Sequence, residues 1–367
     1  MAEPLLTLDA VSQVFRTRHG EVRALDAVSL DLWPGQVVCL VGESGSGKTT
    51  AAKLAAGLRR PTSGQVRYAG QDIWRMPRDQ LRGYRRAVQY IHQDPYASLN
   101  PVHTVFDTLA APLRHHGLVR GRAEAVRRTS ELLVKVDLTP PESFLAKYPH
   151  QLSGGQRQRV SVARALTLGP RLIVADEATS MLDVSIRVSL LNMLAHLREE
   201  LGVGFLFITH DLAIAKYFAW HGHIAVMYLG RVVEYGATPA IINTPQHPYT
   251  QALLNAIPEP DPDLTRRRPR LPLRNVDSAS LLRIPPGCSF HPRCPRFEAG
   301  LCDVLRPELS PLGVRPTRPN SSDRLRLGTR QSPANGSSLE FSAAFPGDDH
   351  SAACHVVARE HAAALAR

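Results

Sequence analysis

The chain has 367 residues, 43% of them hydrophobic, and its 44 Lys and Arg outnumber 33 Asp and Glu, giving a formal net charge of +11. At roughly 150 residues per domain, this length predicts about two or three domains with a substantial core. No apolar run approaches the roughly 18 residues of a membrane-crossing helix, and the N-terminus lacks the pattern of a secretion signal, so we expect a cytoplasmic location.

The first 92 residues or so alternate short apolar runs with turn signals. They predict three strands and a helix, at 5–11, 22–30, 37–41 and 49–58. From 93 to 152 apolar residues recur at helical spacing, which predicts helices at 105–116 and 123–136. We therefore expect an α/β core with some antiparallel strands, interrupted by a helical insertion.

The next region, 153 to about 245, returns to an alternation of helices and strands. Its expected elements are a helix at 156–168, a strand at 172–175, a helix at 185–201 and a strand at 205–208. Beyond His247 the amino-acid composition changes, because thirteen of the 29 prolines lie between Pro258 and Pro319. Proline lacks the backbone donor of a sheet, so this part predicts a coil-rich appendage, and the polar stretch 320–350 is expected to be flexible.

An eight-residue glycine-rich loop separates the apolar strand at 37–41 from the predicted helix. Its sequence fits the P-loop pattern and comprises Gly42, Glu43, Ser44, Gly45, Ser46, Gly47, Lys48 and Thr49. In such a loop, backbone amides converge on phosphate oxygens and the helix N-terminus adds a positive dipole. Lys48 is expected to reach the β- and γ-phosphates, and the Thr49 hydroxyl to coordinate magnesium.

A second apolar strand ends in two carboxylates, Asp176 and Glu177. Ligands of parallel sheets bind at the carboxyl ends of the strands, so these groups are expected beside the P-loop. Asp176 would hold magnesium, directly or through water. Glu177 would point to the other side of the extended chain, towards the attacking water, as the general base.

A third motif identifies the class. The segment Ser153, Gly154, Gly155 and Gln156 opens a helix and resembles the signature of the ABC ATPases. A serine and glycine turn at a helix start also binds phosphate. The resemblance covers residues 5 to about 240. It implies ATP hydrolysis with Mg²⁺, and a head-to-tail pair of subunits in which the P-loop of one and the signature of the other enclose each ATP.

Other family motifs follow in the expected order. Gln93 corresponds to the glutamine that senses magnesium and water, and His210 to the switch histidine that touches the γ-phosphate and helps to orient Glu177. Asp183 lies in the loop that crosses the dimer interface, and Phe15 matches the aromatic that stacks on adenine. Thr50 is carried over as a further nucleotide-binding residue.

Four more stretches resemble the oligopeptide, dipeptide and nickel importer branch: residues 93–101 and 148–151, and two segments of the appendage, 247–254 and 286–295. The resemblance implies a P-loop NTPase (RecA-like) core with an antiparallel β subdomain, an inserted helical subdomain at about 93–152, and an irregular Cys-bearing C-terminal extension. The ATPase domain would span 1–245 and the extension 246–367. Partners would be two transmembrane permease subunits, a second ATP-binding subunit and an extracytoplasmic solute-binding protein, at the cytoplasmic face of the cell membrane.

Four of the five cysteines lie in the extension, at Cys288, Cys294, Cys302 and Cys354, whereas Cys39 lies in a core strand. Disulfides are not expected in a reducing cytosol. The resemblance suggests that the four hold a 4Fe-4S cluster, although their spacing leaves a zinc site or free thiols as alternatives.

The sequence alone leaves two other functions as alternatives. The positive charge is expected to lie on solvated arginine-rich faces, since neither basic block interleaves aromatics as a base-stacking platform would. It would also suit a soluble ABC ATPase acting on ribosomes or nucleic acid, although the chain has one cassette and no long coiled coil. A regulatory metal module with a vestigial ATPase is disfavoured because the catalytic motifs are intact. The cargo is undetermined among peptides, nickel chelates, glutathione-like molecules and opines, as is whether the ATPase pair is identical.

Overall fold

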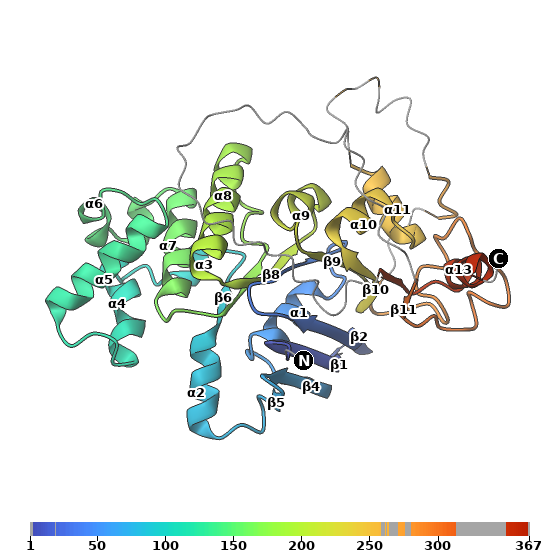
Figure 1. The fold of residues 1–367 in the computed structure, drawn as a ribbon, viewed down its shortest axis with the longest axis horizontal. Coiled ribbons are helices and arrows are strands. Elements are labelled where there is room, and N and C mark those ends of the chain that lie inside the picture. Colours follow the sequence, from blue (N-terminus) through green and yellow to red (C-terminus); the bar gives the residue numbers. More distant parts are fainter. Residues whose placement is uncertain are drawn as a thin grey trace.

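The structure is a computed structural model that describes residues 3–18, 20–257, 261, 263, 271–275, 280–312 and 350–365. It contains a four-stranded antiparallel sheet in the order β2-β1-β4-β5 and an eight-stranded sheet in the order β11-β12-β10-β9-β3-β8-β7-β6 (Figure 1). The smaller sheet comprises β1 (Leu6–Thr17), β2 (Gly20–Leu32), β4 (Ser63–Tyr68) and β5 (Gln71–Asp72). The larger comprises β3 (Val37–Val41), β6 (Val88–Ile91), β7 (Leu172–Asp176), β8 (Gly204–Thr209), β9 (His223–Tyr228), β10 (Arg231–Ala237), β11 (Ser310–Pro311) and β12 (Ser351–Ala352).

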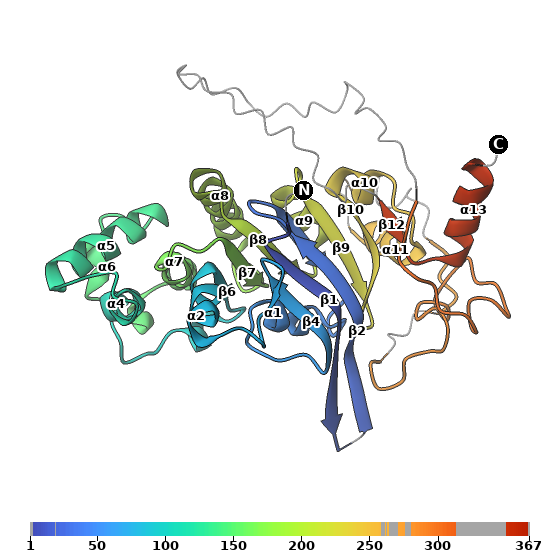
Figure 2. The ribbon, with the colours of Figure 1, turned by 60° about the horizontal axis from the view of Figure 1, so that its bottom comes forward.

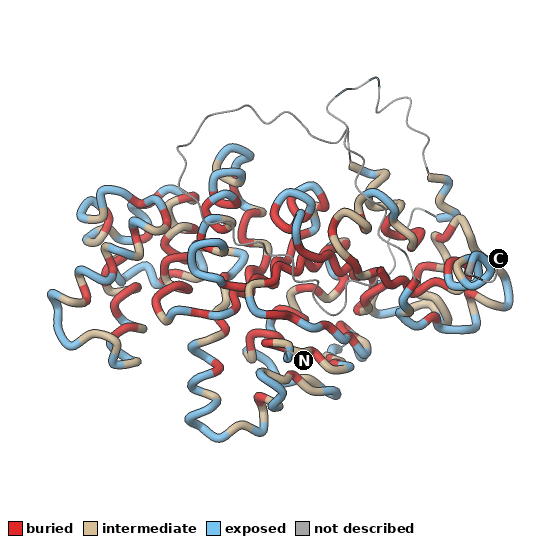
Figure 3. The backbone as a smooth tube through the Cα atoms, in the orientation of Figure 1, coloured by how far each residue is buried: buried red, intermediate tan, exposed pale blue. Residues whose placement is uncertain are grey.

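The parallel strands of the larger sheet are covered on both faces, as Figure 3 shows by their burial. In β3, Val37, Cys39 and Val41 pack in one core cluster with residues of α8 (Val184–Leu201) and α9 (Leu212–Phe218). The alternate residues Val38 and Leu40 pack in a second cluster with α1 (Lys48–Ala55) and the smaller sheet. The predicted α/β core with an antiparallel β subdomain is therefore confirmed.

Between β6 and β7 the chain forms the expected helical insertion, at the left of Figure 1. Its helices are α3 (Pro95–Ser98), α4 (Val105–His115), α5 (Arg122–Lys135), α6 (Glu142–Leu145) and the 3-10 turn η1 (Pro149–Gln151), followed by α7 (Gly154–Leu166). At the start of α4, the Thr104 hydroxyl accepts from the amide of Asp107 and the Asp107 carboxylate accepts from the amide of Thr104, which satisfies two amides at the helix start.

The sequence did not single out α2 (Arg78–Ala87). It is arginine-rich and only Tyr84 of this helix is buried, but Leu81 and Tyr84, three positions apart, both pack against the core, so its apolar face is narrow.

The extension packs back onto the core rather than standing apart from it. After α10 (Thr238–Asn243) closes the predicted ATPase domain, the extension contributes α11 (Pro248–Asn255), α13 (His355–Leu365) and many turns, as the proline content predicts. Its strands β11 and β12 also continue the core sheet beyond β10, which the sequence did not anticipate. Of the stretch 320–350, only His350 lies within the described residues, where it is buried.

Candidate active site

The P-loop connects β3 to α1 and is shaped by glycines that no other residue could replace without strain. Gly42 and Gly47 have φ values of 155° and 104°, and a Cβ on them would lie 2.1 Å from the Met227 carbonyl oxygen and 2.3 Å from the Ala24 carbonyl oxygen. Lys48 is buried and its ammonium donates to the carbonyl oxygens of Gly42 and Glu43, at 2.8 Å each. The loop thus curls around the lysine, at the place where the motif predicts a phosphate site.

Burial lowers the pKa of Lys48, and the nearby carboxylates of Glu177, Asp176 and Glu43 oppose that shift. The lysine therefore lies in a partly desolvated pocket whose carboxylates favour its charged form. A cation in such a pocket is suited to binding a phosphate, because each charge is screened less than in water.

The end of β7 lies beside this loop, as the parallel order β3-β8-β7 requires. The Thr49 hydroxyl donates to Asp176 Oδ1 at 3.1 Å, which brings the two predicted magnesium ligands together. Tyr90 of β6 donates to Asp176 Oδ2 at 2.6 Å, a contact that the sequence analysis missed. Burial raises the pKa of Asp176, while the hydrogen bonds from Tyr90 and Thr49 oppose the rise.

Glu177 follows immediately, with a left-handed φ of 45° that is uncommon outside glycine. Its carboxylate accepts a hydrogen bond from Gln93 Nε2 at 3.0 Å and lies 3.5 Å from His210 Nδ1. Three residues predicted from three separate motifs therefore meet at one carboxylate. Strain of this kind is often found where a side chain must be aimed at a reacting group.

The signature segment lies at the start of α7, away from the P-loop and α1 in both Figure 1 and Figure 2. The Ser153 hydroxyl accepts from the amide of Gln156, and the Gln156 side chain accepts from the amide of Ser153. At Gly155 a Cβ would lie 2.7 Å from Ile186, so this glycine allows α8 to approach closely. The fold does not bring the signature to the P-loop of the same chain.

The remaining predicted residues lie on the surface or near it. Asp183 is exposed at the start of α8, in a loop where Met181 is 57% exposed. Phe15 in β1 is partly buried, with the Arg59 guanidinium 4.9 Å from the centre of its ring. Thr50 is partly buried in α1.

The extension reaches the P-loop through two residues that sequence reasoning did not assign. The Tyr249 hydroxyl accepts a hydrogen bond from the amide of Glu43 at 2.9 Å. Arg293 Nη1 lies 3.1 Å from each carboxylate oxygen of Glu43. Both residues belong to segments that resembled the importer branch, but only the fold reveals that they touch the loop.

The four cysteines of the extension line one small cavity together with His247, His291 and His355, although Cys354 is far in sequence from the other three cysteines. The free space there is about 10 Å³, and all five cysteines of the chain are free thiols. Burial raises the pKa of Cys288 to about 12 and of Cys294 to about 11. In the described ranges, no group of three or more His, Cys, Asp or Glu side chains is arranged to hold a metal ion.

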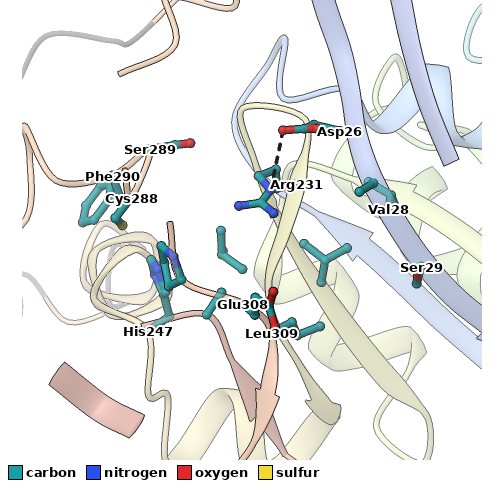
Figure 4. Close-up of a pocket in the computed structure, with 15 residues that line it drawn as sticks. Asp26, Val28, Ser29, Arg231, His247, Cys288, Ser289, Phe290, Glu308 and Leu309 are labelled. Carbon is teal, nitrogen blue, oxygen red and sulfur yellow. Dashed lines mark ion pairs between the residues drawn. The ribbon is translucent and has the colours of Figure 1, made fainter. Parts of the chain in front are cut away.

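A separate hollow of about 290 Å³ lies between β2, β10 and the extension (Figure 4). Arg231 points into it and pairs with Asp26 at 3.8 Å, and Cys288 and Phe290 line its opposite side. None of the residues predicted to bind nucleotide lines this hollow, so it belongs to the packing of the extension on the β subdomain.

Comparisons with known proteins agree with this geometry. The family model described as ABC transporter matches residues 25–180, and the model described as oligopeptide/dipeptide transporter, C-terminal region, matches residues 233–302. A putative peptide import ATP-binding protein of Brucella ovis is 44% identical over 306 residues, which cover 83% of this chain and 94% of that protein. The chain belongs to the ABC transporter ATP-binding proteins of the oligopeptide/dipeptide branch. It is an ATPase whose ATP hydrolysis is coupled to transport.

Two other known proteins are also similar to this ABC ATPase. The glutathione import ATP-binding protein GsiA of Escherichia coli O157:H7 is 44% identical over 289 residues, which cover 77% of this chain and 45% of that protein. The ATP-binding cassette MJ0796, solved as a dimer in a post-hydrolysis state bound to ADP and Pi, aligns with a TM-score of 0.57 and 30% identity over 64% of this chain and 98% of that one. Across the described residues, no helix has the length and apolar character needed to cross a membrane.

Proposed function

We propose that this ABC ATPase powers the uptake of peptides or a related small solute. One observation carries the proposal: the predicted magnesium and catalytic residues meet at one sheet edge, in a chain whose C-terminal region matches the oligopeptide/dipeptide transporter family. These residues are Thr49, Asp176, Glu177, Gln93 and His210. Relatives named for peptide and glutathione import support the same class of cargo. The nucleic-acid alternative gains no support from these names.

Each residue in the site has a role that its position supports. The P-loop amides from Gly42 to Thr49, with Thr50 behind them, bind the phosphates, and Lys48 turns from the loop carbonyls to the β- and γ-phosphates. Thr49, Asp176 and Gln93 would hold Mg²⁺, which neutralises phosphate charge. Glu177 accepts a proton from the attacking water, and its contacts with Gln93 and His210 orient it. Phe15 stacks on the adenine.

The second half of the site comes from another subunit. Because Ser153 and Gly155 lie away from the P-loop of their own chain, they would serve the nucleotide of a partner packed head to tail. The exposed Asp183 loop would lie at that interface. A residue from across the interface can stabilise charge only when the pair is closed, which couples hydrolysis to closing and opening.

The proposed assembly is peripheral to the cytoplasmic face of the cell membrane. In it, residues 1–245 form the ATPase domain and 246–367 the extension. The partners are two permeases, a second ATP-binding subunit and an extracytoplasmic solute-binding protein. The helical insertion at 93–152 would contact the permeases, since it projects from the side of the core at which Gln93 leaves β6.

For the four thiols we propose a 4Fe-4S cluster, with zinc as the alternative. An all-sulfur set of four cysteines suits either one, and no acidic side chain lines their cavity. The thiols must lose protons and turn to make room, because their space is about 10 Å³. Protein isolated without oxygen should contain iron and acid-labile sulfide, lost together on replacing Cys294 by Ser; zinc, or no metal, would contradict the cluster.

The substitution Glu177→Gln tests the catalytic assignment. It keeps the size of the side chain but removes the base, so hydrolysis in the purified complex should fall by about 10²- to 10⁴-fold while ATP binding persists. The matched control is Glu199→Gln on the exposed side of α8, which should leave turnover unchanged. Undiminished turnover in Glu177→Gln would remove Glu177 as the base.

A further inference from the structure

Arg293 joins the Cys-bearing extension to the P-loop across 250 residues of sequence. It directly precedes Cys294, and its Nη1 lies 3.1 Å from both carboxylate oxygens of Glu43. The Arg293 side chain is 12% exposed and that of Glu43 is 36% exposed. Because Arg293 is mostly shielded from water while Glu43 is partly exposed, this charge-assisted contact is held somewhat more firmly than a fully exposed surface pair.

A second contact supports the first from the same direction. Tyr249 is fully buried and its hydroxyl accepts from the amide of Glu43. Its ring packs 4.5 Å from the ring centre of Tyr228 and 5.4 Å from that of Phe290. Phe290 lies between Cys288 and Cys294 in the sequence, and the Arg293 guanidinium carbon lies 5.6 Å from its ring centre. A continuous packed path therefore links the thiol segment to the loop.

The charge on Glu43 gives this link a functional consequence. Glu43 lies inside a loop that binds phosphate, and its carboxylate acts electrostatically on Lys48. An unpaired carboxylate there would repel an incoming polyphosphate, and a glycine-rich loop without side-chain anchors would have to be ordered upon binding. Arg293 offsets the charge and fixes the start of the loop.

We propose that Arg293 is a positioning residue that sets the ATP affinity of the P-loop by neutralising and anchoring Glu43. The inference rests on the proposed nucleotide site. Because coupling between two regions is reciprocal, ATP binding should in turn stabilise the segment that carries Cys288 and Cys294. The extension is then part of the nucleotide site, in addition to carrying the thiols.

The test is a double-mutant cycle on ATP binding by the full chain, with a fluorescent ATP analogue as the probe. Arg293→Gln should weaken binding about three- to fivefold, as expected for loss of one partly exposed pair. Adding Glu43→Gln to that variant should restore the affinity to within about twofold of Glu43→Gln alone, because the unpaired charge is gone. Arg293→Lys should bind nearly as the wild type does.

The matched control is Arg359→Gln, another arginine of the extension, which pairs with Glu298. It should leave ATP affinity unchanged. Wild-type affinity in Arg293→Gln, or no rescue by Glu43→Gln, would overturn the proposal. A fault in folding would not be rescued by changing a residue in the P-loop, so the rescue separates the two explanations. Lys48→Ala tests the nucleotide site itself: if it abolishes binding while Arg293→Gln does nothing, only the inference about Arg293 fails.

Discussion

One anchor between the extension and the core sheet is a buried carboxylate, Glu234 in β10. It is fully buried, and its two oxygens accept from the amides of Gln246 and His247 at 2.7 and 3.0 Å, while His350 Nε2 lies 2.6 Å from Oε1. In Glu234→Gln one oxygen becomes an NH₂ group. Whichever way the amide turns, at least one buried backbone N–H loses its acceptor and faces another donor.

We expect this substitution to cost about 3 kcal/mol, the sum of one orphaned buried donor and the weakening of charged hydrogen bonds. The Tm should fall by about 4 to 6 °C, and residues 350–365 should become accessible to protease before the core unfolds. Thermal denaturation and limited trypsin digestion measure the two effects. The matched control is Glu308→Gln, an exposed glutamate of the same extension. An unchanged Tm and digestion pattern in Glu234→Gln would refute this account of the anchor.

Three further outcomes follow from single contacts. Gly47→Ala should weaken the binding of an ATP analogue by about 10- to 100-fold, because the new Cβ would lie 2.3 Å from the Ala24 carbonyl oxygen. Normal affinity would show that the loop shifts to accommodate the methyl group and would contradict this prediction. Tyr90→Phe removes a 2.6 Å hydrogen bond to Asp176, so the Mg²⁺ concentration that gives half-maximal ATPase activity should rise about tenfold. An unchanged Mg²⁺ titration would show that Tyr90 does not help Asp176 to bind the metal. Thr104→Ala should cost about 1 kcal/mol in urea denaturation by removing the cap of α4, whereas equal midpoints would contradict it.

Much of the fold follows from local pattern. The strand at 37–41 is predicted with its observed bounds, and the two helices predicted in the insertion, α4 and α5, begin and end within about two residues of expectation. These elements have strong apolar periodicity or a glycine-rich boundary. By contrast, α2 has only a narrow apolar face among its arginines, and the two-residue strands β11 and β12 are too short for any period to be seen.

The groups that we propose as catalytic were also accessible from the sequence, because each lies at the end of a core strand in a recognisable motif. Parallel strand order then places Asp176, Glu177 and His210 beside the P-loop. Tyr90 was missed because a tyrosine within a strand carries no signal of which carboxylate it will meet. Its role depends on β6 being the neighbour of β7, which is a property of the assembled sheet.

Chain order and local spacing thus specify the α/β core, the helical insertion and the nucleotide motifs, since their chemistry is carried by residues close together in sequence. The family resemblance already grouped Cys354 with the three earlier cysteines, but only the tertiary structure decides that Arg293 and Tyr249 meet Glu43. The physical reason is that such contacts are set by packing and by the return of distant segments to one sheet edge. Arg293 and Glu43 are 250 positions apart in the sequence, and no pattern in the residues between them predicts that their side chains meet.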